Sequence, residues 1–541
     1  MQIALAQLNF HVGNFEANTS KITNAIEKAK TQNVDLIVFP ELAICGYPPR
    51  DFLEFEEFIT ECEKSIANIA KNCKNIAAIV GAPSKNYNQR GKRLYNSAYF
   101  LYEGRVQKVA HKTLLPNYDI FDEYRYFEPN TNFELIEFKG EKIALTICED
   151  IWNIHDKLYA SDPMEELVKL QPTLMINIAA SPFNYNQSAT RKEVLQANYN
   201  QYKIPLIYCN HVGAQTELVF DGGSTYINKD GVFENELAYF KEDFQIVDTQ
   251  RISAVKNQVP LNKIASIHQA LILGLRDYFK KLGFNKALVG LSGGIDSAVV
   301  FALACEALGA ENCMGILMPS QFSSDHSVSD AKKLAQHLNA ENHVVEIEPL
   351  FSIFSEQLAP LFQNLPFNLA EENLQARIRG TLLMAVSNKF GHILLNTSNK
   401  SEASVGYGTL YGDMNGGLSL LGDLYKTEVY ALAHHINRNK EIIPMNSIEK
   451  APSAELRPGQ KDSDSLPEYD ILDQILYQYI ELRQGPEAII HQGFDEKIVK
   501  KVLKMVNISE YKRHQTPPIL RVSNKAFGTG RRMPIVGKYL V

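Results

Sequence analysis

The stretch that decides the fold is "VGLSGGIDSAVV", residues 289–300, just past the midpoint of the chain. An apolar run at 287–291 leads into Ser292-Gly293-Gly294, and a second apolar run with helical character begins after Ser297. The pattern predicts a strand, a glycine turn and the N-terminus of a helix. Glycines let backbone amides approach an anion, and the helix adds free N–H groups and a positive dipole end. We therefore expect this turn to bind phosphate, although an ordinary tight turn between strand and helix would also use paired glycines.

Asp296 adds a second element to the predicted phosphate site. It falls in the first turn of the predicted helix, beside the place where phosphate would bind. A carboxylate repels phosphate unless a cation lies between them, so Asp296 implies Mg²⁺. No lysine follows the glycines, which excludes a Walker A loop.

The pattern around this stretch predicts two α/β domains. Downstream, strand-like runs such as "KALVGL", "CMGILMPS" and "HVVEIE" alternate with amphipathic helices, as in a doubly wound parallel sheet. The first 245 residues also alternate strands and helices, which favours a layered α/β sandwich. Their first helix is expected in "NTSKITNAIEKAKTQ", with Asn18 or Ser20 as its N-cap. The polar stretch 246–264 is interpreted as a linker between domains at 1–245 and 265–541.

Composition narrows the class of protein. A chain of 541 residues is too long for one core, and its formal net charge of −7 argues against a general nucleic-acid binder. The seven cysteines form no C-x-x-C pair, so a metal knuckle or a disulfide framework is not expected, and free thiols suit a reducing cytosol. No signal peptide and no apolar run long enough to span a membrane is apparent. We expect a cytoplasmic protein with no membrane or nucleic-acid partner.

The second half resembles a known family through several motifs. Ser-Gly-Gly-Ile-Asp-Ser is similar to the pyrophosphate loop of the N-type ATP pyrophosphatases, which cleave ATP to AMP and pyrophosphate. With "NLQARIRG" (373–380), "LLNTSNKSEASVGYGTLYGDMNGGLSLLGDLYKTEVYALA" (394–433) and "EYKRHQTPP" (510–518), residues 265–541 resemble the NAD synthetases. The resemblance implies an adenine nucleotide α-hydrolase-like fold and ATP-dependent amidation of deamido-NAD.

The same resemblance implies roles for individual residues, each of which alone could be a solvated surface group. Arg377 and Arg379 would face the dinucleotide phosphates, and Asp413 lies in a substrate-binding stretch. In "APSAEL", Ser453 replaces a more frequent threonine but keeps the hydroxyl. Asp296 and Glu402 would hold Mg²⁺. The residues expected to contact ATP are Gly290, Leu291, Ser292, Gly293, Gly294, Ile295, Asp296, Ser297, Thr397 and Lys426, and those expected to contact deamido-NAD are Asn373, Glu402 and Lys512.

The first half contains candidates for a nucleophilic site. Glu41 follows a strand in "VFPELAICGY", Lys112 lies in "VAHKTLLPNYDIFDEYRYF", and Cys148 ends the strand of "IALTICEDIW". A cysteine at the end of a strand is a plausible nucleophile if a base and a cation accompany it, although Cys148 alone could equally be a core thiol. Together, and in this order, the motifs resemble the carbon–nitrogen hydrolase (nitrilase) superfamily, whose fold is an αββα sandwich.

That resemblance implies that Glu41 is the general base, that Lys112 stabilises the oxyanion and that Cys148 forms a γ-glutamyl thioester. The remaining cysteines, Cys209 included, are interpreted as structural. The family often has a lysine where this chain has Gln187, so the anchor of the glutamine carboxylate stays open, with Arg191 as a substitute. The residues expected to bind glutamine are Tyr118, Glu123, Ser181 and Gln187, with Tyr47 and Trp152 lining the pocket and Glu123 a second acid near Lys112.

The two halves together predict a homo-oligomeric ligase that acts on deamido-NAD, ATP and L-glutamine with Mg²⁺. One alternative is another glutamine-fed ATP pyrophosphatase such as a GMP synthetase. That family usually relies on a Cys–His–Glu glutaminase, and no such histidine motif accompanies Cys148. The other is a dinucleotide-sensing protein without activity, which should have lost at least one of Glu41, Lys112, Cys148 and Asp296.

Overall fold

The chain forms two compact units, Met1–Pro260 and Leu261–Val541. The computed structural model describes residues 1–88, 90–154, 158–251, 262–363 and 365–540. Within these ranges no helix combines the length and the apolar character that crossing a bilayer requires.

The first unit is built on two six-stranded sheets. Their strand orders are β14-β1-β2-β3-β4-β5 and β13-β12-β9-β8-β7-β6. β1, β2 and β3 are parallel to one another, as are β7, β8 and β9, so their carboxyl ends meet at one edge of each sheet. The strands are β1 (Gln2–Gln7), β2 (Leu36–Val38), β3 (Ala77–Lys85), β4 (Leu94–Tyr102), β5 (Arg105–His111), β6 (Ile136–Phe138), β7 (Glu141–Ile147), β8 (Leu174–Ala179), β9 (Leu206–Asn210), β12 (Thr225–Ile227), β13 (Phe233–Glu234) and β14 (Asp243–Asp248), with β10 (Val212–Gln215) and β11 (Leu218–Asp221) as a separate hairpin.

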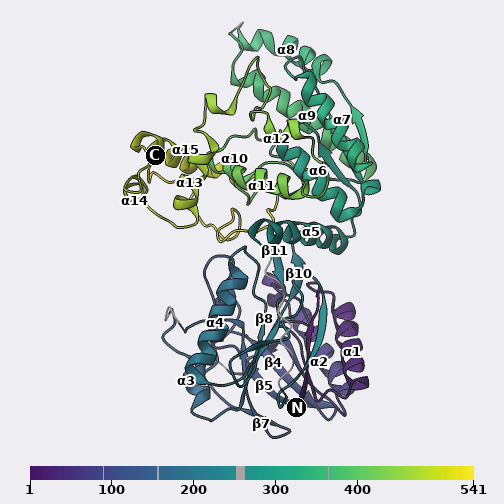
Figure 1. Ribbon diagram of the computed structural model, residues 1–541, viewed down its shortest axis with the longest axis vertical. Coiled ribbons are helices and arrows are strands. Elements are labelled where there is room, and N and C mark those ends of the chain that lie inside the picture. The colour runs from purple at the N-terminus through teal and green to yellow at the C-terminus, as the bar shows by residue number, and fades with distance from the viewer. Residues whose placement is uncertain (89, 155–157, 252–261, 364, 541) are drawn as a thin grey trace. The chain divides into compact units, whose positions relative to one another are not determined.

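Helices cover the outer face of each sheet. α1 (Phe15–Thr31) and α2 (Glu56–Asn72) pack on the first sheet through Ile26 and Ile66, among others. α3 (Pro163–Val168) and α4 (Gln187–Tyr202) cover the second sheet, and Figure 1 shows them on the opposite side of the strands from α1. The four layers confirm the predicted αββα sandwich.

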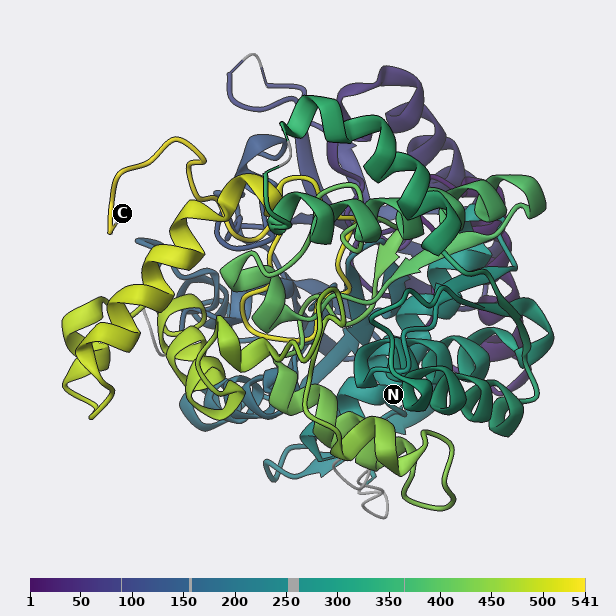
Figure 2. The same cartoon turned by 90° about the horizontal axis from the view of Figure 1, so that it is seen from above.

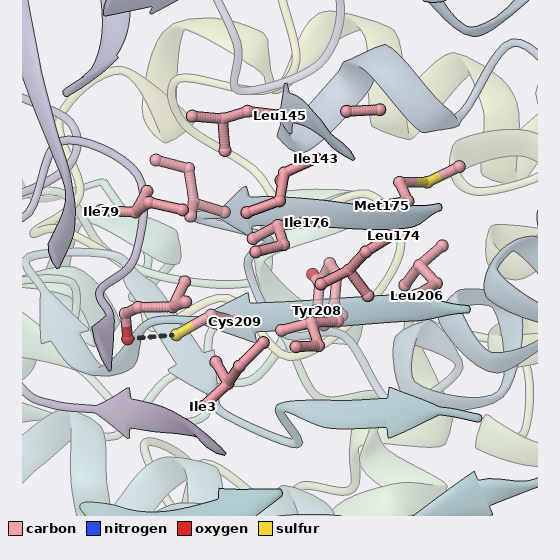
Figure 3. Close-up of a cluster of buried hydrophobic side chains, with 14 of the residues drawn as sticks. Ile3, Ile79, Ile143, Leu145, Leu174, Met175, Ile176, Leu206, Tyr208 and Cys209 are labelled. Carbon is pink, nitrogen blue, oxygen red and sulfur yellow. Dashed lines mark hydrogen bonds between the residues drawn. The ribbon is translucent and has the colours of Figure 1, made fainter. Parts of the chain in front are cut away.

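A continuous apolar core separates the two sheets. Figure 3 shows Ile3 and Ile79 of the first sheet with Ile176 and Leu206 of the second, all fully buried. Cys209 lies in the same core, where its thiol donates to the carbonyl oxygen of Val38 at 3.4 Å. This placement agrees with a structural role for Cys209.

Two local predictions for this unit were wrong. The N-cap of α1 is Asn14, whose side chain accepts from the backbone N–H of Ala17, whereas Asn18 is buried inside the helix. Asn18 turns its amide to the carbonyl oxygens of His11 and Ile44 instead. The predicted linker at 246–264 begins too early, because β14 continues to Asp248 and pairs antiparallel with β1. It also ends too late, since α5 begins at Lys263, and residues 252–261 lie outside the described ranges.

The second unit is a doubly wound parallel sheet, as predicted. Its strand order is β17-β16-β15-β18-β19, and every neighbouring pair is parallel. β15 is the point at which the order changes direction, and ligands of open α/β sheets bind outside the strand ends at such a point. The strands are β15 (Ala287–Gly290), β16 (Cys313–Leu317), β17 (Glu341–Val344), β18 (Ile393–Asn396) and β19 (Leu418–Ser419).

Helices pack on both faces of this sheet. α6 (Ile295–Leu308) and α7 (Asp325–Leu338) contact β15, β16 and β17, and α5 (Lys263–Leu282) and α11 (Lys426–Ile436) lie behind α6. α8 (Glu348–Phe362) and α9 (Leu369–Phe390) share a separate apolar cluster with β15 and β16 on the other face. α10 (Lys400–Val405), α13 (Tyr469–Ile480), α14 (Pro486–Ile490), α15 (Glu496–Ile508) and α16 (Glu510–Arg513) follow, along with the short α12 (Met445–Glu449). The C-terminal helices form their own cluster at one edge of the unit, labelled in Figure 1 and yellow-green in Figure 2.

Candidate functional sites

Three predicted residues of the first unit follow strand ends and come together. Glu41 lies just beyond β2, Lys112 directly follows β5, and Cys148 directly follows β7 as the first residue of a short 3₁₀ helix, Cys148–Ile151. Each is at most 5% exposed. The carboxyl ends of strands from both sheets therefore build one buried site.

Lys112 is the centre of this site. Its ammonium donates to Glu41 Oε1 at 2.8 Å and to both carboxylate oxygens of Glu123 at 2.9 Å. Burial opposes the charge of Lys112, but Glu123 and Glu41 outweigh it and raise its pKa well above the usual value. For Glu123, burial disfavours the charged carboxylate and raises the pKa, and the positive charge of Lys112 acts in the opposite direction. The ammonium is thus a fixed positive charge shared by two carboxylates.

The Cys148 backbone has an unusual conformation. Its φ of +47° lies in the left-handed region, which L-residues other than glycine seldom adopt. Asn177 Nδ2 donates to the Cys148 carbonyl oxygen at 3.4 Å. Burial, reinforced by the negative charge of Glu41 and opposed by Lys112, raises the pKa of the Cys148 thiol well above its usual value. At neutral pH the resting group is therefore a thiol, and attack by sulfur requires a base that removes its proton.

Asp150 is a residue of this site that the sequence analysis missed. Its carboxylate accepts from the backbone N–H groups of Thr113 at 2.9 Å and Leu114 at 2.8 Å, and of Ile147 at 3.0 Å. Thr113 and Leu114 directly follow Lys112, and Ile147 directly precedes Cys148. One buried carboxylate therefore joins the segments that carry Lys112 and Cys148. A carboxylate two residues after a candidate nucleophile was the available signal, but spacing alone does not reveal its partners.

The residues expected to bind glutamine lie around Cys148. Tyr118 and Tyr159 both donate their hydroxyls to Glu149 Oε1, at 2.8 and 2.9 Å. Gln187 Nε2 donates to Ser181 Oγ at 3.2 Å, which brings these two predicted residues into contact. The Tyr47 hydroxyl donates to Glu123 at 2.9 Å, and Trp152 packs at the edge of the inter-sheet core.

Arg191 does not provide the substitute anchor that the sequence suggested. Its guanidinium donates two hydrogen bonds to Asp221, at 3.0 and 2.6 Å, and its side chain is only 2% exposed. A buried bidentate pair satisfies both charges, so the Arg191 interpretation was wrong.

The glycine turn of the second unit has the predicted strand–turn–helix form. β15 ends at Gly290 and α6 begins at Ile295. Gly293 has φ +76°, and a Cβ there would lie 2.2 Å from the backbone oxygen of Ser327, so only glycine fits without displacement. Ser292 Oγ lies 3.0 Å from Ser297 Oγ and accepts from the backbone N–H of Gly294 at 3.2 Å.

A cavity of ≈ 280 Å³ opens above this turn. It is lined by both segments that follow the central strands β15 and β18, the position expected for a ligand in this topology. Arg379 and Asp413 also line it, as do Lys450, Ser453 and Glu455, whereas Arg377 is exposed and lies outside the lining. The predicted ATP residues in the lining are Gly290, Leu291, Ser292, Gly294, Ile295, Asp296, Ser297, Thr397 and Lys426, together with Glu402.

Three charged side chains converge at one end of the cavity. Lys426 Nζ donates to Asp296 and lies 3.4 Å from Glu402 Oε1. Burial raises the pKa of Glu402 to about 8, with Lys426 opposing and Asp296 reinforcing the shift. Asn399 donates to Asp296 at 2.9 Å and caps α10 reciprocally with Glu402. Asn399 was not predicted from the sequence, although an asparagine three residues before a glutamate is the signature of a capping box.

Two predicted deamido-NAD residues lie outside the cavity lining. Asn373 accepts from the Thr409 hydroxyl at 2.7 Å. Lys512 Nζ donates to the carbonyl oxygens of Gly406 and Gly408, both at 2.7 Å. Both residues are therefore attached to the segment that follows α10 and leads to Asp413, a residue of the cavity.

The described residues contain no group of three or more His, Cys, Asp or Glu side chains arranged to hold a metal. Asp296 and Glu402 form a pair of carboxylates around one cationic group, Lys426. Two hard oxygen ligands suit Mg²⁺ if phosphate oxygens and water complete its shell, because Mg²⁺ usually binds through one or two carboxylates plus substrate phosphates. The residues present thus fit the ion as part of a nucleotide complex.

Both halves of the chain match known families. Residues 2–257 match the carbon–nitrogen hydrolases and residues 267–516 match NAD synthase. The chain is 45% identical to the glutamine-dependent NAD(+) synthetase of Synechocystis sp., covering 98% of each protein. It is 42% identical to that of Acinetobacter baylyi, covering 99% of this chain and 98% of the relative.

Solved structures give the same result. A glutamine-dependent NAD+ synthetase from Acinetobacter baumannii, in complex with adenosine diphosphate, is 39% identical with a TM-score of 0.79 and covers 99% of this chain and 98% of its own. A glutamine-dependent NAD(+) synthetase from Cytophaga hutchinsonii has a TM-score of 0.86 over 99% of this chain and 98% of its own. At 21% identity, the latter shows the fold alone.

Proposed function

The chain belongs to the family of glutamine-dependent NAD(+) synthetases, and from this premise we propose how its two sites perform the reaction. It is a ligase that uses ATP to amidate deamido-NAD with ammonia from L-glutamine, giving NAD, AMP, pyrophosphate and glutamate. The observation that carries the proposal is the buried Lys112 ammonium bound by Glu41 and Glu123 beside Cys148. The full-length similarity to NAD synthetases decides against the alternative of a GMP synthetase.

In the first unit, Cys148 is the nucleophile of glutamine hydrolysis. Its sulfur attacks the side-chain amide carbon while Glu41 takes the thiol proton. Lys112 stabilises the negative oxygen that develops, since a fixed charge in a dry site needs no reorganisation during the reaction. The C–N bond then breaks, ammonia leaves with the proton from Glu41, and a thioester remains on Cys148. Glu41 then deprotonates a water that attacks the thioester. The C–S bond breaks, glutamate leaves, and Glu41 returns the proton to the Cys148 sulfur.

Glutamine is held by groups around the thiol. The side chains of Tyr118, Ser181 and Gln187 present hydroxyl and amide groups to its polar ends. Glu149, which directly follows the nucleophile and is 4% exposed, is the carboxylate suited to the substrate's α-ammonium group. Burial raises the pKa of Glu149, and a bound ammonium would stabilise its charged form.

In the second unit, the deamido-NAD carboxylate attacks the α-phosphorus of ATP. Pyrophosphate leaves, and the backbone N–H groups and hydroxyls of residues 292–297 bind it at the positive end of α6. Lys426 neutralises phosphate charge, with Thr397 as a further ATP contact. Asp296 and Glu402 would hold Mg²⁺, which when bound shields the phosphate charges and acts as a Lewis acid. Ammonia then attacks the acyl adenylate and AMP leaves.

Deamido-NAD extends along the segment after α10. Asn373 and Lys512 are fixed on this segment, and Glu402, Asp413 and Arg379 reach the cavity beside it. Burial lowers the pKa of Arg379 to about 10, so its guanidinium is still charged at neutral pH and can pair with a phosphate.

We also propose that the chain works as a homo-oligomer in the cytoplasm. Apolar side chains on α8, α9 and the segment between them are strongly exposed. They include Ile353 at 57%, Leu361 at 75%, Leu365 at 67% and Leu369 at 65% exposed. Exposed apolar residues grouped in this way are typical of subunit interfaces.

The test is a reconstituted reaction with purified protein, deamido-NAD, ATP and Mg²⁺, supplied with glutamine. We expect NAD, AMP and glutamate in a ratio of one to one to one. Release of ADP instead of AMP would contradict adenylation, and glutamate without NAD would contradict the role of the second unit.

A further inference from the structure

One fully buried asparagine contacts Glu41 and Glu123 of the amidase site with its side chain and Lys112 with its backbone. Asn96 lies in β4, and its Nδ2 donates to Glu41 Oε1 at 2.7 Å and to Glu123 Oε2 at 3.2 Å. Its backbone carbonyl oxygen accepts from the backbone N–H of Lys112 at 2.8 Å. The sequence signal for Asn96 was faint, a polar residue within the apolar strand "NSAYFLY".

The amide is oriented by its partners. An asparagine NH₂ group has two hydrogens, and here each faces one carboxylate. The Asn96 Oδ1 atom, by contrast, has no hydrogen-bond partner among the described residues. A buried acceptor without a partner is destabilising. The Asn96 side chain therefore contributes favourably through its NH₂ donors and not through Oδ1.

Two carboxylates that share one ammonium repel each other, and their orientation depends on the remaining donors. Among the described residues, the Glu41 carboxylate accepts hydrogen bonds from Lys112, from Asn96 and from the backbone N–H of Ala180, which lies 2.9 Å from Oε2. Without Asn96, Glu41 Oε1 would depend on Lys112 alone, which Glu123 contacts with both oxygens.

We propose that Asn96 is a positioning residue for glutamine hydrolysis, whose amide group aims the Glu41 carboxylate at the Cys148 thiol and keeps it apart from Glu123. This inference rests on the proposed roles of Glu41 and Cys148. Asn96 acts through Glu41 and touches no reacting atom.

The pH dependence of hydrolysis distinguishes this role from simple packing. The groups that face Glu41 are Lys112, Glu123, Tyr47 and Cys148, and the imidazole of His211 lies 2.5 Å from its backbone oxygen. Carboxylates that lose a donor hold their proton to higher pH. We therefore expect the acid limb of the N96A rate profile to move to higher pH.

The experiment compares wild type, C148A, N96A and N96L in two assays on the full chain, glutamine hydrolysis and ammonium-driven NAD formation. N96L keeps a branched side chain of similar shape but has no hydrogen-bond donor and adds no charge. We expect kcat for glutamine hydrolysis to fall about 10- to 100-fold in both Asn96 variants, because hydrogen bonds to charged groups are strong. KM for glutamine and the ammonium-driven rate should stay within about twofold of wild type, as expected for a group that touches no substrate.

N228A is the matched control. Asn228 is a buried asparagine of the same unit that also donates to a buried carboxylate, Glu234 Oε1 at 2.5 Å, away from the strand ends of the site. We expect N228A to hydrolyse glutamine at the wild-type rate. If N96A unfolds the first unit, N96L carries the test, since it refills the buried site with a side chain of similar shape.

The outcomes separate the inference from the function on which it rests. Wild type that hydrolyses no glutamine would contradict the proposed function itself. If N96L hydrolyses glutamine at the wild-type rate, Asn96 only fills space. If N96L instead raises KM and leaves kcat unchanged, Asn96 is a substrate contact. Either of the last two results overturns the positioning role.

Discussion

Substitution of Gly293 by alanine should disable the second site while leaving the first intact. The added Cβ would lie 2.2 Å from the Ser327 backbone oxygen, and ordinary contact begins at 3.4 Å. The turn and the start of α7 must therefore separate by about 1 Å, a displacement that can lower a rate about 100-fold when it misplaces reacting groups. We expect ammonium-driven NAD formation to fall by at least that factor.

The same substitution should also lower stability through two effects. Left-handed backbone at φ +76° costs an alanine roughly 1–2 kcal/mol. Overpacking against backbone atoms adds about 1–3 kcal/mol, because Ser327 is held in a helix and cannot rotate away. The sum, about 2–5 kcal/mol, corresponds to a fall in Tm of about 4–20 °C, at about 2–4 °C per kcal/mol for a unit of this size.

Gly283 provides the control. It has φ +78° at the C-terminal end of α5, and an added Cβ would meet nothing within 4 Å. G283A therefore carries only the backbone effect and should keep wild-type synthesis. The assays are ammonium-driven NAD formation, glutamine hydrolysis and thermal unfolding for each variant. If G293A forms NAD at the wild-type rate, or if G293A and G283A lose NAD formation equally, the contact with Ser327 does not restrict this position as described.

Three further predictions concern charge. K112M leaves Glu41 and Glu123 buried without their cation. Glutamine hydrolysis should therefore fall about 10²- to 10³-fold, and the unfolding free energy of the first unit should fall by about 3–5 kcal/mol. Ammonium-driven synthesis, which does not use this site, is the control. Burial raises the pKa of Asp150 from 3.8 to about 7, so between these pH values the native state binds a proton that the unfolded state has released. The free energy of unfolding, relative to that of D150N, should therefore decrease as pH rises from about 4 to about 7 and then level off. Thermal unfolding measured at several pH values would contradict this if stability rose over that range. Chelation by EDTA should abolish ammonium-driven NAD formation until Mg²⁺ is restored, and synthesis that persists in EDTA would exclude the proposed ion.

The sequence predicted the elements whose chemistry is local. The glycine turn at 292–297 is specified by neighbouring residues, because the strand, the left-handed Gly293 and the helix start follow one another directly. Glu41, Lys112 and Cys148 were predicted through their family motifs, and the structure brings them together because each follows the end of a strand.

What the sequence did not predict depends on contacts between distant segments. Asn96 acts through Glu41 and Glu123, and Asp150 binds the backbone of Thr113 and Leu114, all in segments distant along the chain, so nothing in their neighbourhoods indicates these partners. Arg191 is not an anchor because it pairs with Asp221, and this partner could not be predicted because it lies 30 residues away in the sequence. The linker was placed too early since β14, whose sequence mixes polar and apolar residues, is stabilised by pairing with β1 at the other end of the unit's sequence.

The most direct test of two separable sites is NAD formation from deamido-NAD and Mg²⁺–ATP by wild type and C148A, with either glutamine or ammonium as the nitrogen source. We predict that C148A loses glutamine-driven synthesis and keeps the ammonium-driven rate. Continued use of glutamine by C148A would show that Cys148 is not the nucleophile.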